Sequence, residues 1–130
     1  MIRPMVCAAL MSLVALPAAA QSSAPLCKGS PKVVGECFTF YGRMTVHSGA
    51  PALRIWPTGT KRLLGVADTD NSPETVAVPE DLQALLATDP AEINGKFEVC
   101  PLDAARPNRL TTVCLESATS LKAVPKAPTP

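Results

Sequence analysis

The sequence lacks most of the patterns on which enzymes and metal sites depend. His47 is the only histidine, which excludes a zinc site of the histidine-rich kind. No two cysteines have C-x-x-C spacing, so neither a paired structural zinc site nor a redox motif is expected. There is also no G-x-S-x-G elbow, no phosphate-binding loop and no H-E-x-x-H. We therefore expect a protein without metal or cofactor and without enzymatic activity.

Long apolar runs are absent as well. The most apolar segment, residues 5–16, is shorter than the roughly 18 residues that a membrane-spanning helix needs. It follows Arg3 and precedes Ala18-Ala19-Ala20, a combination typical of a signal peptide that is cut before Gln21. The sequence thus predicts residues 1–20 as a signal peptide and a periplasmic or secreted protein that does not span the membrane.

An excess of charge of one sign is also lacking. The chain has 12 basic and 11 acidic residues, and loss of Arg3 with the signal peptide would leave 11 of each. A neutral mature chain is not drawn as a whole to nucleic acid or to an anionic membrane. Nucleic acid is therefore not expected among the partners.

The cysteines predict two disulfides. Cys7 would leave with the signal peptide, so that four remain: Cys27, Cys37, Cys100 and Cys114. An even number in a small exported chain is typical of a disulfide framework. Short separation favours the pairs 27–37 and 100–114. The last three cysteines all project from the polar side of their predicted strands, however, so that the pair 37–100 competes.

The two ends of the mature chain differ from its middle. Residues 21–34 and the proline-rich residues 121–130 have no apolar period, which predicts a flexible N-terminal segment and a disordered tail. Residues 35–120 form the single predicted domain.

The first half of this domain alternates with the period of β-strands. Residues 35–47 place Phe38, Phe40, Met44 and Val46 on one face. A second strand, 52–56, and a third, 61–66, are separated by the turn Pro57-Thr58-Gly59-Thr60 and are predicted to form a hairpin.

The second half begins with a helical pattern. Leucines at helical spacing predict a short helix over residues 79–88, with Pro79 at its first position. Asn94-Gly95 is then expected as a turn, followed by strands at 96–102 and 110–118.

This order of elements predicts the fold class. Three strands, a helix and two strands make a mainly β (α+β) domain, and they match a small OB-like, five-stranded, partly open barrel with its short helix between strands 3 and 4. Two disulfides would stabilise it. An open α+β sandwich has the same elements and is the alternative.

Four segments of the sequence also resemble known proteins. They are residues 35–44, 54–66, 97–102 and 113–117, which together cover most of the domain. In these runs the chain resembles a group of small secreted bacterial proteins of uncharacterised function. The resemblance implies a secreted protein with a four-cysteine framework, and it brings no catalytic residues.

Isolated polar residues are interpreted as surface features. His47 lies at the end of a strand on its polar face, and Glu80 and Asp81 fit the positive end of the helix dipole better than acid–base chemistry. Asp68-Thr69-Asp70-Asn71-Ser72 begins like a calcium loop, but Pro73 stands where an EF-hand needs glycine. We expect that loop to be solvated.

Charge is distributed unevenly, and this points to a candidate ligand surface. No lysine or arginine occurs between residues 63 and 95, whereas the preceding hairpin is basic. There the only tryptophan is flanked by basic residues, and these five form the candidate ligand surface: Arg43, Arg54, Trp56, Lys61 and Arg62. Guanidinium groups beside an aromatic ring can hold a sugar, a base or an anion.

The sequence therefore favours a secreted or periplasmic non-enzymatic binding module that recognises a protein or an envelope polymer. A structural or protective envelope protein without a small ligand is the alternative, and a small hydrolase is the least favoured. The position of Trp56, in a groove or in the core, separates the first two hypotheses.

Overall fold

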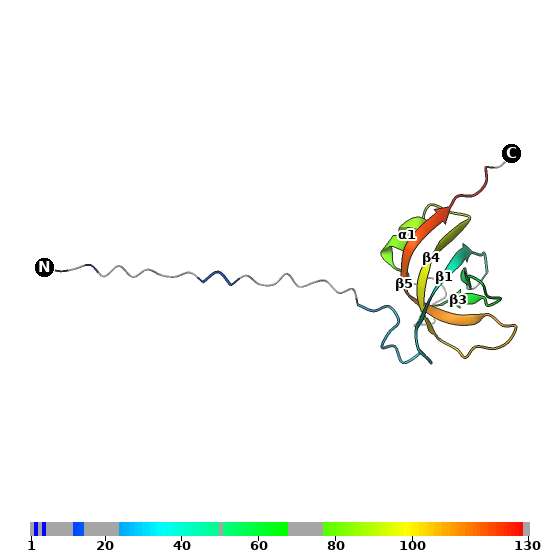
Figure 1. The fold of residues 1–130 in the computed structure, drawn as a ribbon, viewed down its shortest axis with the longest axis horizontal. Coiled ribbons are helices and arrows are strands. Elements are labelled where there is room, and N and C mark those ends of the chain that lie inside the picture. Colours follow the sequence, from blue (N-terminus) through cyan, green and yellow to red (C-terminus); the bar gives the residue numbers. More distant parts are fainter. Residues whose placement is uncertain are drawn as a thin grey trace.

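The barrel is built from five strands, β1 (Phe38–Val46), β2 (Leu53–Pro57), β3 (Leu64–Val66), β4 (Glu92–Pro101) and β5 (Thr111–Val124), and α1 (Glu80–Leu86) lies between β3 and β4 (Figure 1). The computed structural model describes residues 2, 4, 12–14, 24–49, 51–67 and 77–128. The predicted signal peptide lies mostly outside these residues, as do Gln21 and the loop 68–72.

The strands close in the order β1-β2-β3-β5-β4. β1 pairs antiparallel with both β2 and β4, whereas β3 and β5 pair in parallel, with Leu64 opposite Thr111. The OB-like prediction is confirmed, and the barrel is closed. The open sandwich is excluded, because the pairing of β3 with β5 completes the circuit of strands.

Alternation along the strands fills the barrel. Leu53 and Ile55 of β2 and Phe97 and Val99 of β4 point inward and are buried, as the period of two predicts. Val46 is the exception on β1, since 56% of it is exposed. Its position explains this exposure, because β1 residues pair with β4 only up to Met44.

The helix is shorter than predicted. It comprises seven residues, and Pro79 occupies the cap position before it instead of its first position. Leu82 is fully buried and belongs to the barrel's core cluster, with Leu85 and Leu86 packed more loosely. The amphipathic pattern therefore indicated the correct face of α1.

The predicted turn at Asn94-Gly95 is wrong, because both residues lie inside β4. The ladder between β4 and β5 shifts register there, and a Cβ on Gly95 would lie 2.7 Å from a methyl group of Leu121. Glycine thus permits a close approach of two strands here instead of a chain reversal. β5 continues to Val124, so residues 121–124 of the predicted tail belong to the sheet.

The segment 24–34, predicted as flexible, is attached to the barrel. Cys27 is buried and bonded to Cys114 of β5. The Glu116 carboxylate accepts hydrogen bonds from the backbone N–H groups of Cys27 and Lys28. Val34 N–H donates to the Pro101 carbonyl at 2.9 Å. Val33 also packs against the cluster of Cys27, Cys100 and Cys114, so a disulfide, hydrogen bonds and a small apolar contact together hold this segment.

The disulfides are Cys27–Cys114 and Cys37–Cys100. The pairing favoured by short separation is wrong, and its competitor is found. Phe38 pairs with Val99 across β1 and β4, which places Cys37 beside Cys100, and Cys100 is opposite Cys114 in β4 and β5. Neither distance along the chain nor strand register alone selects the partners: Cys100 lies opposite Cys114 but is bonded to Cys37, and the N-terminal segment carries Cys27 to Cys114. Within the described ranges, no helix is long and apolar enough to cross a membrane.

Candidate functional site

The five residues of the predicted ligand surface come from β1, from β2 and from the segment after β2. Arg43 and Trp56 are directly opposite each other on the outer face of β1 and β2. Arg54 is next to the loop between these strands, and Lys61 and Arg62 lie in the segment that connects β2 with β3. The structure thus places Arg43, Arg54 and Trp56 on the outer face of β1 and β2, and Lys61 and Arg62 in the β2–β3 connection.

Trp56 is outside the core. It is 44% exposed, and the Arg43 guanidinium lies 5.6 Å from the ring centroid. Its indole N–H donates to the Thr60 carbonyl, which ties the ring to the loop after β2. Arg43 in turn forms an ion pair with Glu92 at 3.3 Å. These contacts position the indole on the outer surface and cover part of its face with a cation.

Replacing Trp56 by alanine is therefore expected to have a modest effect on stability. The loss comprises one hydrogen bond, one cation–π contact and the apolar contacts of the covered part of the ring, about 2 kcal/mol together. Urea unfolding of the wild type and of Trp56→Ala measures it. A loss of 3 kcal/mol or more, about the value for a buried tryptophan, would contradict the outer position.

Arg54 acts within its own loop. Its Nε donates to the Pro51 carbonyl at 3.2 Å, and it faces Thr45 and Gly65 across the neighbouring strands. The guanidinium thus braces the connection between β1 and β2. Arg54 is not among the residues that surround the pocket described next.

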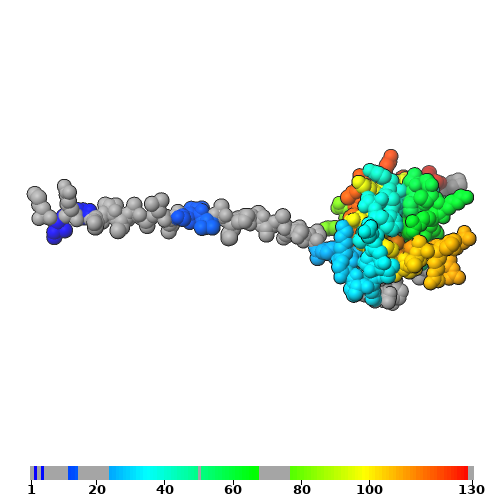
Figure 2. Space-filling view, turned by 60° about the horizontal axis from the view of Figure 1, so that its bottom comes forward, coloured from blue at the N-terminus to red at the C-terminus, as the bar shows by residue number. Residues whose placement is uncertain are grey.

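A pocket of about 660 Å³ lies between the β2–β3 and β4–β5 loops. It is lined by four cations and no carboxylate, namely Lys61, Arg62, Arg106 and Arg109. In Figure 2 the residues near 60, in green, lie directly beside the β4–β5 loop, in orange. We call this site the basic pocket.

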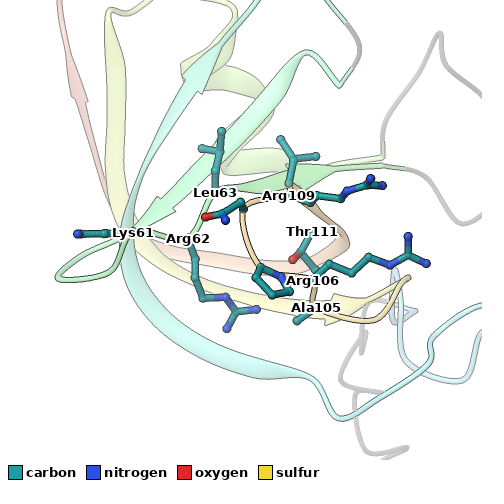
Figure 3. A pocket seen from close by; sticks show the side chains of 10 residues that line it. Lys61, Arg62, Leu63, Ala105, Arg106, Arg109 and Thr111 are labelled. Carbon is teal, nitrogen blue, oxygen red and sulfur yellow. The ribbon is translucent and has the colours of Figure 1, made fainter.

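Figure 3 shows how the four cations lie around the basic pocket. Arg106 and Arg109 extend together to one side, Arg62 extends to another, and Lys61 points away from all three. The Arg62 guanidinium also lies 5.8 Å from the ring centroid of Phe38. Charge is thus spread along the rim of the pocket and does not converge on one point.

Backbone hydrogen bonds hold the β4–β5 loop in place. Leu102 N–H donates to the Thr112 carbonyl at 2.9 Å, and Thr112 N–H donates to the Asp103 carboxylate at 3.0 Å. Thr111 N–H donates to the Leu63 carbonyl at 3.1 Å, which joins the two sides of the pocket. Cys100 and Cys114 lie at the base of the same loop and are both in disulfides. The loop is therefore organised before any ligand binds.

Arg106 and Arg109 were missed by the sequence analysis. They occur in the loop Arg106-Pro107-Asn108-Arg109, far along the chain from the basic hairpin. Two arginines in the loop between predicted strands 4 and 5 could have indicated this side of the pocket. In OB folds, that loop commonly contributes to ligand binding. Parallel pairing of β3 with β5 brings the two basic segments together.

Two other groups of polar side chains in the described part of the chain bear on catalysis and metal binding. His47 Nε2 lies 2.8 Å from the Thr45 hydroxyl on the exposed surface. Cys27, Cys100 and Glu116 have ligand atoms within 4.8 Å of one another, but both sulfurs are in disulfides and supply no thiolate. The basic pocket is the described feature with the clearest chemistry. Neither a family model nor, at a significant level, a curated protein or a solved structure matches the chain.

Proposed function

We propose that this protein is a periplasmic or secreted non-enzymatic binding module that recognises an anionic partner, a protein or an envelope polymer, at the basic pocket. One observation carries the proposal: four cations and no carboxylate line a cavity between two loops. Among the described residues, the ion pairs formed by basic side chains involve Lys28, Arg43 and Lys126. None of these three residues lines the pocket.

The disulfides support the proposed periplasmic or secreted location. Two disulfides persist in oxidising compartments, and the described helix does not cross a membrane. A neutral mature chain limits long-range attraction, so that recognition depends on the local concentration of charge in the pocket.

Dextran sulfate is a suitable probe, with neutral dextran as its control. Each cation that contacts a polyanion contributes about one unit to the slope of log affinity against log salt. Arg106→Ala/Arg109→Ala is therefore expected to bind more weakly and to lower that slope by about two. Calorimetric titration of the exported protein at several salt concentrations measures both quantities.

The matched control is Lys32→Ala/Lys122→Ala, which removes the same charge from exposed positions outside the pocket. It is expected to keep the wild-type affinity and slope. Equal losses in both double variants, or no binding of dextran sulfate by the wild type, would remove the support for an anion site. Those results would leave the alternative of a structural or protective envelope protein.

A further inference from the structure

On the basis of the proposed function, we infer that the basic pocket takes an acidic polysaccharide chain, in which anionic groups repeat along linked sugar rings. The first reason is the arrangement of the cations. Arg62 extends in a different direction from Arg106 and Arg109 (Figure 3). The cations therefore surround the pocket instead of converging on one point, an arrangement that suits a chain whose charges repeat along its length.

The second reason is the lack of a stacking platform in the pocket. Proteins that bind single-stranded nucleic acid place bases on aromatic rings. The residues that line this pocket include no aromatic side chain. The exposed aromatics of the outer face, Tyr41 and Trp56, lie elsewhere, and each has a cation near its ring: Lys96 at 5.8 Å and Arg43 at 5.6 Å. Bases therefore have no ring in the pocket to stack on.

The third reason is the closed barrel. An extended peptide commonly binds by adding a strand to a free sheet edge, where its backbone hydrogen bonds supply affinity. At the pocket, β3 is paired on both sides, with β2 and with β5, so a peptide that entered the pocket would find no free strand edge there. It would have to bind without adding a strand to the sheet.

The walls of the pocket suit sugar rings. Leu63, Leu110 and Pro107 offer apolar surface to the C–H faces of a ring, and the Asn108 amide can both donate to and accept from hydroxyl groups. Cations at the rim then meet the acidic substituents. This combination of apolar walls, one amide and spaced cations corresponds to the chemistry of a charged glycan.

The test compares probes of different length and class on the exported protein by calorimetry. The oligogalacturonate octamer is expected to bind at least about tenfold more tightly than galacturonate, because successive units reach both sides of the pocket. Arg62→Ala and Arg106→Ala/Arg109→Ala should each weaken octamer binding severalfold, and the triple variant should weaken it further. Lys32→Ala/Lys122→Ala should not. Circular dichroism and melting curves establish that each variant is folded.

Competing ligands give distinguishable results. Equal affinity for galacturonate, inorganic phosphate and the octamer would overturn the chain inference and leave an anion-binding module. Tighter binding of octaglutamate or of a thymidine oligonucleotide than of the octamer would overturn it in favour of an acidic protein or a nucleic acid. Binding of dextran sulfate but not of the octamer would restrict the glycan to sulfated chains. Failure of every anionic probe, dextran sulfate included, would reject the proposed function as well.

Discussion

Replacing Cys27 and Cys114 together by alanine is expected to lower the free energy of unfolding by about 4 to 5 kcal/mol. The disulfide closes a loop of 87 residues, so that its loss releases much conformational freedom in the unfolded chain. A small domain has a total stability of about 5 to 15 kcal/mol. The variant should therefore be near the limit of folding. Alanine is preferred to serine because both positions are buried and would leave a hydroxyl without partners.

The same variant should also release the N-terminal segment. Without the bond to Cys114, residues 24–34 are held by the hydrogen bonds to Glu116 and from Val34, by the ion pair of Lys28 with Glu98 and by the packing of Val33. Trypsin is expected to cut after Lys28 and Lys32 faster than in the wild type. Urea unfolding and limited proteolysis measure the two effects.

Cys37→Ala/Cys100→Ala is the matched control, because its bond closes a loop of 63 residues between strands that are already paired. Its free energy of unfolding should fall by about 4 kcal/mol. Trypsin should nevertheless cut after Lys28 and Lys32 more slowly than in Cys27→Ala/Cys114→Ala, because the bond between Cys27 and Cys114 is intact. Unchanged stability in both double variants would contradict the observed pairing, as would peptide mapping that finds Cys27 joined to Cys37.

Phe97→Ala is the second large expected effect, a loss of about 3 to 5 kcal/mol. Phe97 is fully buried in the barrel, and its ring centroid lies 6.1 Å from that of Phe40. Truncation removes apolar burial and leaves a cavity that strands on all sides cannot close, since each is held by its neighbours. Urea unfolding of the wild type and of the variant gives the loss in free energy of unfolding, provided that the slopes of free energy against urea concentration agree.

Two further variants serve as controls for the loss of stability in Phe97→Ala. Phe97→Leu retains most of the apolar volume and should be clearly less destabilised. Tyr41→Ala changes an aromatic residue that is 62% exposed and should have a small effect. Equal losses at Phe97 and Tyr41 would contradict the assignment of inner and outer faces.

Most of the barrel was predictable from periodicity. A strand buried on one side must alternate, and Ile55 and Phe97 follow this rule on either side of the barrel. The order of the elements then restricted the fold to two architectures. Boundaries were predicted less well, because register shifts and cross-strand contacts, as at Gly95, are decided by the neighbouring strand.

Two of the four cations that line the basic pocket were predicted from the sequence. Lys61 and Arg62 occur in a basic hairpin, which marks a charged surface without any knowledge of the fold. Arg106 and Arg109 meet them because β3 and β5 pair in parallel, and this contact joins segments remote in sequence. Arg54, by contrast, is near Lys61 in the chain but turns to the Pro51 carbonyl instead.

The sequence by itself determined which side chains face inward on most strands, the presence of one short amphipathic helix, and a four-cysteine framework with an OB-like order of elements. These are local properties, set by side-chain period and composition. Tertiary structure alone decided the cysteine partners, the outer position of Trp56 and the assembly of the basic pocket. The position of Trp56 and the pocket depend on which strands lie side by side, because register brings together residues that are remote along the chain. The cysteine partners depend in addition on the course of the N-terminal segment, which places Cys27 against β5 and leaves Cys100 to Cys37.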